Sequence, residues 1–241
     1  MTMLLEALAM EIPSRLNPTD VRARAGEMIA LIGPNGGGKT SVLRALAGAE
    51  DARGSVLIDG TLVEPFGARR GRLLAFMAAS REIGWPIPVA DMIRLGVGQV
   101  NEPGIGALLA EFELESLANR RVNSLSTGER ARVLMARVLA SQARLLLLDE
   151  PLSNLDPYWV LRFLAAMRRQ SQAGQTVICA LHDLSLLGEF DRAIPIADGQ
   201  IVGDGPPTIV LNSDCFERAF RVIPDAAGWS ISPSADQRSS Q

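Results

Sequence analysis

The sequence has 241 residues, of which 47% are apolar, and a formal net charge of −3. This composition is ordinary for a globular protein with a full core, and the length allows one large domain or two small ones. The slightly acidic charge excludes the overall basic field of nucleic-acid binders, so we expect no nucleic acid among the partners. No stretch approaches the ~20 apolar residues of a membrane span, and the N-terminal stretch lacks the basic leader of a secretory signal. Cys179 and Cys215 have no metal-ligand spacing, which indicates buried thiols in a reducing compartment.

In chain order, short apolar runs alternate with helical patterns. Residues 28–32 read as a strand that enters a glycine-rich loop, and "SVLRALAG" continues as a helix that Gly48 can close. "GSVLIDG" has the form of an edge strand between two glycines. Residues 145–148 and the run "QTVICALHD" are continuous apolar strands, which is typical of parallel strands covered on both faces. The alternation predicts an α/β fold with a parallel central sheet.

Between these strands, the stretch from about residue 79 to residue 142 contains no convincing buried strand, so we expect it to be mainly helical and to form its own lobe. The C-terminal run "ISPSADQRSSQ" is polar and carries nothing that could form a core, so we expect it to fray. Within the helical stretch, one apolar helix face is formed by residues spaced three and four apart: Ala131, Leu134, Met135, Val138 and Leu139.

The glycine-rich loop "GPNGGGKT", residues 33–40, fits the pattern G-x-x-x-x-G-K-[ST] and lies between a predicted strand and a predicted helix. Its glycines allow backbone N–H groups to turn inward, and the helix that starts there adds its positive dipole end. Lys39 would reach the β- and γ-phosphates of a nucleotide, and the Thr40 hydroxyl would take one Mg²⁺ position. A chance glycine-rich turn with an accidental lysine does not account for the strand and helix around it. The predicted nucleotide-binding residues are Gly33, Pro34, Asn35, Gly36, Gly37, Gly38, Lys39, Thr40 and Ser41.

Two adjacent carboxylates, Asp149 and Glu150, follow the apolar run at residues 145–148. The carboxyl end of a buried strand is the usual place for ligands in open α/β sheets. Two neighbouring carboxylates repel each other unless a cation or a proton is shared, and a phosphate-held Mg²⁺ supplies that cation. We therefore expect Asp149 on the metal and Glu150 as the group that polarises the attacking water. The alternative is a solvated acidic turn that caps the next helix, with Pro151 as the stop.

Five motifs in this order and spacing resemble the nucleotide-binding subunits of ABC transporters: the phosphate loop, "SLSTGERARVLMARVLA", "LLLLDEP", "SNLD" and "LHD". The resemblance covers about residues 3–222. It implies a P-loop NTPase core with a parallel central sheet, an antiparallel β edge region and an inserted helical subdomain. The implied division of this single domain is a core of about 1–78 and 142–222, a helical subdomain of about 79–141 and a tail of 223–241.

The resemblance also implies that ATP joins two copies of the chain head to tail, with Mg²⁺ as cofactor. The N-terminus of the helix in "SLSTGERARVLMARVLA" would then face the γ-phosphate held by the opposite copy, because the N-terminus of a helix is an anion site. A simple Ser-capped amphipathic helix fits the same residues. The implied cross-dimer residues are Ser126, Thr127, Gly128, Glu129 and Asp156.

The sequence contains a single histidine, His182, directly after the run "VICAL". Taken alone, a polar residue that happens to end a buried strand is the simpler interpretation. In the family that this chain resembles, a histidine at this place contacts the γ-phosphate, and imidazole can donate to a phosphate oxygen near neutral pH. With the other motifs in place, we assign His182 to the catalytic group, together with Glu150 and Lys39.

The sequence departs from the family pattern at several positions. The family usually has an aromatic residue in its first strands that stacks on adenine, and "MEIPSRLNPTDVRARAGE" contains none, so we expect the base to rest on an aliphatic side chain such as Ile12. Ala78 and Ala79 replace the usual proline and glutamine, and that glutamine normally reaches the Mg²⁺ and the attacking water. Thr127 replaces a glycine, which adds bulk near phosphate, and Glu129 replaces the commoner glutamine. Hydrolysis could be slower as a result, or coupling could depend on the loop backbone.

The C-terminal region "ADGQIVGDGPPTIVLNSDCFERAFRV" is similar to that of subunits that energise uptake of iron–siderophores, haem and cobalamin. We therefore expect a cytoplasmic ATPase, peripheral to the inner face of the cell membrane, that pairs with a polytopic permease. Two alternatives remain open. One is a soluble ABC-type ATPase without a transport role, and the other is a regulatory subunit that binds ATP but barely hydrolyses it.

Overall fold

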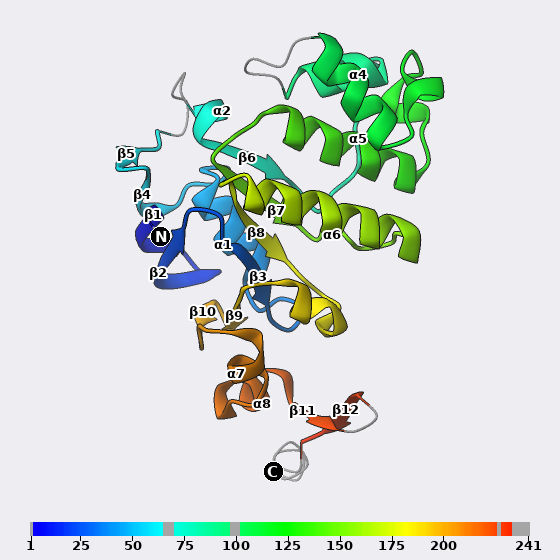
Figure 1. Cartoon of the computed structure of the whole chain (residues 1–241). Coiled ribbons are helices and arrows are strands. Elements are labelled where there is room, and N and C mark those ends of the chain that lie inside the picture. The colour runs from blue at the N-terminus through cyan, green and yellow to red at the C-terminus, as the bar shows by residue number, and fades with distance from the viewer. Residues whose placement is uncertain (1, 65–69, 97–101, 226–227, 233–241) are drawn as a thin grey trace.

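A computed structural model describes residues 2–64, 70–96, 102–225 and 228–232 of the chain (Figure 1). The strands are β1 (Met3–Ile12), β2 (Leu16–Arg24), β3 (Met28–Ile32), β4 (Arg53–Ile58), β5 (Thr61–Leu62), β6 (Leu74–Met77), β7 (Leu145–Asp149), β8 (Thr176–Ala180), β9 (Arg192–Ala197), β10 (Gln200–Ile201), β11 (Val222–Asp225) and β12 (Gly228–Ile231). The helices are α1 (Lys39–Leu46), α2 (Arg70–Leu73), α3 (Val89–Arg94), α4 (Glu102–Glu111), α5 (Thr127–Ala140), α6 (Pro157–Gln172), α7 (Pro207–Leu211) and α8 (Asp214–Phe220). Short 3₁₀ helices span Glu115–Leu117, Val122–Ser124 and Leu184–Glu189.

The central sheet has the strand order β10-β9-β3-β8-β7-β6. Its pairs from β9 to β6 are all parallel, and β10 pairs antiparallel with β9. Along β7, Leu146 and Leu148 face one core cluster while Leu145 and Leu147 face another, and all four are fully buried. A strand covered on both faces must be apolar at every position. The predicted parallel sheet is therefore confirmed, and the predicted strand at residues 28–32 has the bounds of β3.

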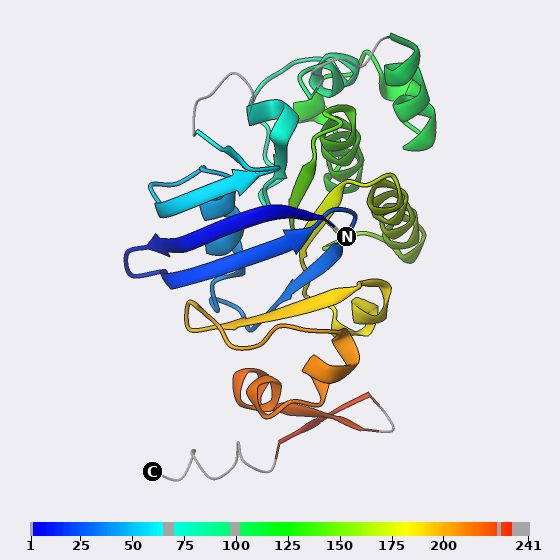
Figure 2. The ribbon, with the colours of Figure 1, turned by 60° about the vertical axis from the view of Figure 1, so that its left-hand side comes forward.

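A second sheet with the order β2-β1-β4-β5 is antiparallel and packs, together with α1, over one face of the central sheet (Figure 2). Helix α1 ends as expected, because Gly48 adopts a positive φ of 56° and its N–H bonds to the Ala45 carbonyl. The prediction of an edge strand at "GSVLIDG" is wrong, since β4 lies between β1 and β5. Two flanking glycines indicate where a strand ends and carry no information about its neighbours.

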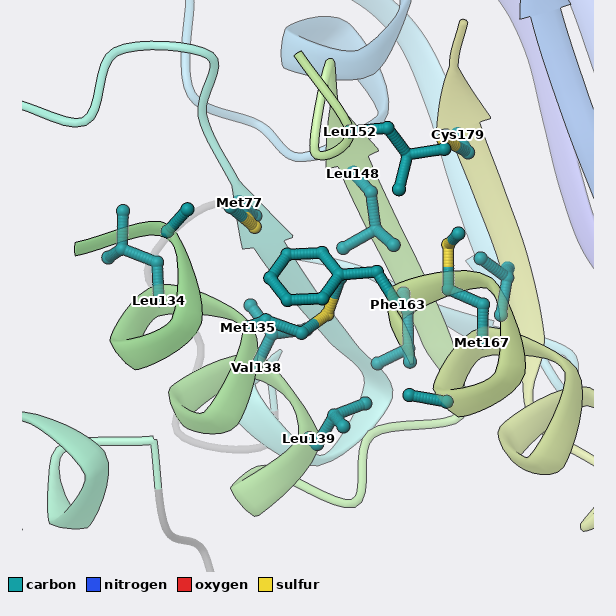
Figure 3. Close-up of a cluster of buried hydrophobic side chains, with 14 of the residues drawn as sticks. Met77, Leu134, Met135, Val138, Leu139, Leu148, Leu152, Phe163, Met167 and Cys179 are labelled. Atoms are coloured by element: carbon teal, nitrogen blue, oxygen red, sulfur yellow. The ribbon is translucent and has the colours of Figure 1, made fainter. Parts of the chain in front are cut away.

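Helices α5 and α6 cover the opposite face of the central sheet. Phe163 of α6 is fully buried, and around it lie Met135 of α5, Met77 of β6 and Leu148 of β7 (Figure 3). Between β6 and β7 the described residues form helices and no strand, as expected. The predicted apolar face of α5 is buried at all five positions: Ala131, Leu134, Met135, Val138 and Leu139.

The C-terminal part of the described chain forms α7, α8 and the β11–β12 hairpin, which lie at the far end of the molecule from α4 (Figures 1 and 2). The prediction of fraying is wrong for the first two residues of the polar run, because Ile231 belongs to β12 and Ser232 is fully buried. Residues 233–241 of that run lie outside the described residues. Cys179 is buried and Cys215 is partly exposed. Among the described residues, none of the helices combines the length and apolarity that a membrane crossing requires.

Candidate nucleotide-binding site

The phosphate loop connects the carboxyl end of β3 to α1, which begins at Lys39. Gly38 is the residue before the helix and has a φ of 114°, a conformation that side chains other than glycine rarely adopt. A Cβ atom on Gly33 would lie 2.1 Å from the Ile196 carbonyl oxygen of β9, so the loop passes too close to that strand for any side chain. The loop therefore presents backbone N–H groups and a helix N-terminus to a single place, which is the arrangement that binds phosphate.

Lys39 extends from the first turn of α1 back across the loop. Its Nζ donates to the carbonyl oxygens of Gly33, at 2.7 Å, and Pro34, at 3.2 Å. Burial lowers the pKa of this ammonium, and the negative charges of Glu150 and Asp149 partly oppose that shift. A partly desolvated cation interacts strongly with an incoming phosphate, because the effective dielectric constant around it is low.

Thr40 and Asp149 form the candidate metal site. The Thr40 hydroxyl donates to Asp149 Oδ1 over 3.2 Å, whereas the buried Oδ2 has no hydrogen-bond partner among the described residues. Burial raises the pKa of Asp149, with the hydrogen bond from Thr40 opposing that shift. An unsatisfied carboxylate oxygen beside a hydroxyl suits Mg²⁺, which takes oxygen ligands and draws most of its shell from phosphates and water. The residues therefore fit the predicted Mg²⁺, and phosphate oxygens and water would supply its remaining ligands.

Glu150 follows β7 directly, and His182 lies two residues beyond β8. The His182 Nε2 lies 2.7 Å from Glu150 Oε1, so the two side chains share a hydrogen bond at neighbouring strand ends. Glu150 has a φ of 51°, and a left-handed conformation costs a residue with a side chain roughly 1–2 kcal/mol. Strain of this kind persists only where the surrounding contacts hold it, and it is common at functional sites.

A cavity of about 780 Å³ lies over the phosphate loop and is lined by Asn35, Lys39, Thr40, Glu150 and His182. The loop glycines 36–38 and Ser41 also line it, whereas Gly33, Pro34 and Asp149 are not among the lining residues. The structure thus brings the predicted catalytic groups and most of the predicted nucleotide-binding residues to one cavity.

The far side of this cavity consists of residues that sequence patterns did not indicate, Arg15 and Asn17 among them. Arg15 donates through Nη1 to both carboxylate oxygens of Glu50, at 3.0 and 3.2 Å. Glu50 also accepts from Arg44 at 2.7 Å, and that hydrogen bond is the main cause of the lowered pKa of Glu50. Ile12, which we expected to contact the base, is only 7% exposed and packs in the core. That expectation is wrong, because the alternation along β1 turns Ile12 inward.

The predicted cross-dimer residues lie outside the lining of this cavity. Ser126 caps α5 by accepting from the Glu129 N–H at 3.3 Å, and Glu129 accepts from the Ser126 N–H at 2.7 Å. This reciprocal pair is a capping box, for which glutamate serves as well as glutamine. Thr127 is exposed, and Asp156 caps α6 by accepting from the Trp159 N–H at 3.1 Å.

Ala79 lies just beyond β6, beside the acidic strand end. Its side chain carries no polar group, but its backbone N–H interacts with the Asp149 carboxylate and acts to lower the pKa of that group. The backbone at this position therefore interacts with Asp149 even though the usual glutamine is missing.

Comparison with known proteins agrees with this geometry. A family model described as ABC transporter matches residues 16–153. The hemin import ATP-binding protein HmuV of Streptomyces coelicolor is 37% identical over 224 residues, covering 87% of this chain and 80% of that protein. The HmuV of Rhodopseudomonas palustris strain CGA009 is 33% identical over 243 residues, covering 92% of this chain and 91% of that protein.

Two solved structures share the fold. One is a dimeric ATP-binding cassette in a post-hydrolysis state with ADP and Pi, with a TM-score of 0.74 and 20% identity over 85% of this chain and 99% of the other. The other is an ATP-binding subunit of an ABC transporter, with a TM-score of 0.77 and 23% identity over 90% of this chain and 93% of the other. The chain therefore belongs to the ABC transporter family, as an ATP-binding subunit that hydrolyses ATP.

Proposed function

We propose that this chain drives the import of haem, or of a related cargo of the iron–siderophore and cobalamin class, across the cell membrane. The observation that carries the ATPase part is the Glu150–His182 pair, 2.7 Å apart, in the cavity of the phosphate loop. What supports haem as cargo is the similarity along most of the chain to proteins named for hemin import.

In the proposed mechanism, the loop N–H groups and Lys39 bind the nucleotide phosphates. Thr40 and Asp149 would hold Mg²⁺, which would supply positive charge to offset the charge of the phosphates. Glu150 orients the attacking water and accepts its proton, since the carboxylate lies at the cavity and is held in place by its neighbours. The Nε2–H of His182 holds Glu150 in position in the nucleotide-free chain, and it turns to a γ-phosphate oxygen once ATP is bound.

A second copy of the chain, placed head to tail, completes the site. The support for this is the exposed N-terminus of α5, where the N–H groups of Thr127 and Gly128 precede the first backbone hydrogen bond of the helix, from Arg130 to the Ser126 carbonyl, and suit an anion. Ser126 and the Gly128 amide of one copy would contact the γ-phosphate held by the other. Thr127, Glu129 and Asp156 would shape the surrounding interface.

We further propose that the single domain is organised as a core of about 1–78 and 142–222, an inserted helical subdomain of about 79–141 and a tail of 223–241. The helical segment carries the α5 N-terminus and would transmit closure of the dimer to a polytopic permease. The subunit would then lie peripherally on the cytoplasmic face of the membrane.

The ATPase part is tested with purified chain and with Glu150→Gln, by measuring MgATP hydrolysis across protein concentration. If two copies of the chain form each site, turnover per chain should rise with protein concentration. Turnover should vanish in Glu150→Gln, while this variant still binds ATP. Turnover per chain that does not depend on concentration would contradict the two-copy site.

The cargo is tested in a strain that lacks the gene, grown with haem as the only iron source. We expect growth to fail and to return with the wild-type gene but not with Glu150→Gln, while growth on a ferrous salt stays normal throughout. Unimpaired growth on haem, together with failed uptake of a siderophore or of cobalamin, would reassign the cargo. Unimpaired uptake of all three would contradict the import proposal.

A further inference from the structure

Arg81 is a buried arginine that the mechanism above does not use. It lies in the segment of residues 78–87, between β6 and α3, which belongs to no helix or strand. Its side chain does not point to solvent, because only 8% of the residue is exposed. Arginines are almost never buried to this extent unless they are paired.

The guanidinium of Arg81 reaches the turn that carries Glu150. Nη2 donates to the Pro151 carbonyl at 3.1 Å, and it lies 3.4 Å from both the Glu150 carbonyl oxygen and Ser153 Oγ. The Ser153 hydroxyl and backbone N–H also donate to the Glu150 carbonyl, at 2.9 and 3.3 Å. Three donors thus converge on the carbonyl of the residue that has the strained φ of 51°.

Charge adds to these contacts. Burial lowers the pKa of Arg81, and the negative charge of Glu150 opposes that shift, so the guanidinium also interacts with the Glu150 carboxylate. Nη1 is buried and has no hydrogen-bond partner among the described residues. A buried arginine with an unsatisfied donor carries a desolvation penalty, which an apolar residue at the same position would not carry. Packing alone therefore does not explain an arginine here.

We propose that Arg81 is a positioning residue for Glu150. Its hydrogen bonds hold the left-handed turn after β7, and its charge keeps the carboxylate directed into the cavity. Because Arg81 belongs to the segment that follows Ala79, it also makes the position of Glu150 depend on that segment. This inference rests on the proposed role of Glu150 in hydrolysis.

The test compares Arg81→Gln, Arg81→Lys and Ser153→Ala with wild type, measuring kcat and KM for MgATP under single-turnover and steady-state conditions. Loss of positioning predicts a kcat about 10²-fold lower in Arg81→Gln, with KM and the affinity for a fluorescent ATP analogue unchanged. Arg81→Lys keeps the charge and one donor and should recover part of kcat. Ser153→Ala should lower kcat in the same direction by a smaller factor, because it removes one of the three donors.

Arg137→Gln is the matched control, since Arg137 is a partly buried arginine in the last turn of α5, whose pKa burial also lowers. It should leave kcat at the wild-type value.

Wild-type kcat in both Arg81→Gln and Ser153→Ala would overturn the inference, as would a KM that rises while kcat stays constant. If Arg81→Gln does not fold, wild-type kcat in both Arg81→Lys and Ser153→Ala overturns it, and a lowered kcat in Ser153→Ala at full thermal stability supports it. Full turnover in Glu150→Gln would instead contradict the proposed function itself, which separates the two failures.

Discussion

His182 Nε2 and Glu150 Oε1 lie 2.7 Å apart, although the residues are separated by 32 positions in the sequence. The parallel register of β7 and β8 explains this distance, because it pairs Leu148 with Cys179 and Asp149 with Ala180. Each side chain follows the end of its own strand, so adjacent strands deliver a carboxylate and an imidazole to the same edge of the sheet. The pair exists because of this strand order.

His182→Ala should lower kcat for MgATP about 10²- to 10³-fold, which is the usual effect of removing one donor from a developing negative charge. His182→Gln keeps an N–H donor of similar reach and should retain more activity than the alanine variant. Both are measured by steady-state hydrolysis with ATP binding as a control. Equal, unchanged turnover in the two variants would exclude both roles of His182, the contact with the phosphate and the positioning of Glu150.

Asp149→Asn should raise the Tm of the nucleotide-free chain at pH 7. Burial raises the pKa of Asp149 above its usual 3.8, so the folded state disfavours the ionised carboxylate. That stability difference between variant and wild type is absent below the unfolded pKa, grows as the pH rises from the unfolded to the folded pKa, and is constant above the folded pKa. Thermal unfolding from pH 3.5 to pH 7 checks this sign. A variant that is less stable than wild type at pH 7, without Mg²⁺ or nucleotide, would contradict it.

Lys39 is the only lysine in the sequence, so an amine reagent reports on the phosphate loop alone, apart from the chain's α-amino group. Lys39 is 5% exposed, and its lowered pKa increases the fraction of neutral, reactive amine at a given pH. We expect slow modification at pH 9 that saturating MgATP suppresses, measured by mass spectrometry of the peptide that contains residue 39. Lys39→Arg is the control and should lose this modification. Labelling that ATP does not slow would contradict the contact with phosphate.

Arg15→Ala should raise KM for ATP about 3- to 10-fold and leave kcat unchanged, which corresponds to the loss of one cation–π contact. With phosphates on the loop, the rest of the nucleotide extends toward the side of the cavity that Arg15 lines. A guanidinium held by Glu50 can stack on a planar base. Arg53→Ala is the control, because Arg53 is an exposed arginine that pairs with Glu11 outside the cavity. An equal KM in both variants would exclude Arg15 from base binding.

Phe163→Ala should lower the free energy of unfolding by about 3–5 kcal/mol, because it leaves a cavity in a packed core. Phe163 is fully buried and makes edge-to-face contacts with Phe112, at a centroid distance of 5.8 Å, and Trp159, at 6.3 Å. Leu161→Ala on the same helix is the control, since Leu161 is 67% exposed and its loss should change stability by less than about 0.5 kcal/mol. Urea denaturation measures both, and comparable losses would contradict the assigned core.

Where the sequence pattern is local, prediction and structure agree. The strand at residues 28–32, the apolar face of α5 and the glycine end of α1 each depend on residues within a few positions of one another. Strand β9 was not predicted, because Arg192 and Pro195 interrupt its apolar pattern. Proline lacks an N–H group, which normally indicates an edge strand or a bulge. Strand β6 is only four residues long and its middle residues are not fully buried, so it carries a weak signal.

The phosphate loop, the acidic pair and the single histidine could be identified in the sequence because their chemistry requires particular residue types at fixed short spacings. The sequence could not decide what surrounds them. Long-range pairing sets those neighbours. The order of β8 beside β7 brings His182 to Glu150, and the inward face of β1 removes Ile12 from the cavity. The path of the chain after β6 buries Arg81 against the turn that carries Glu150. These contacts depend on which strands are adjacent and which way each side chain faces, and only the packed tertiary structure fixes both.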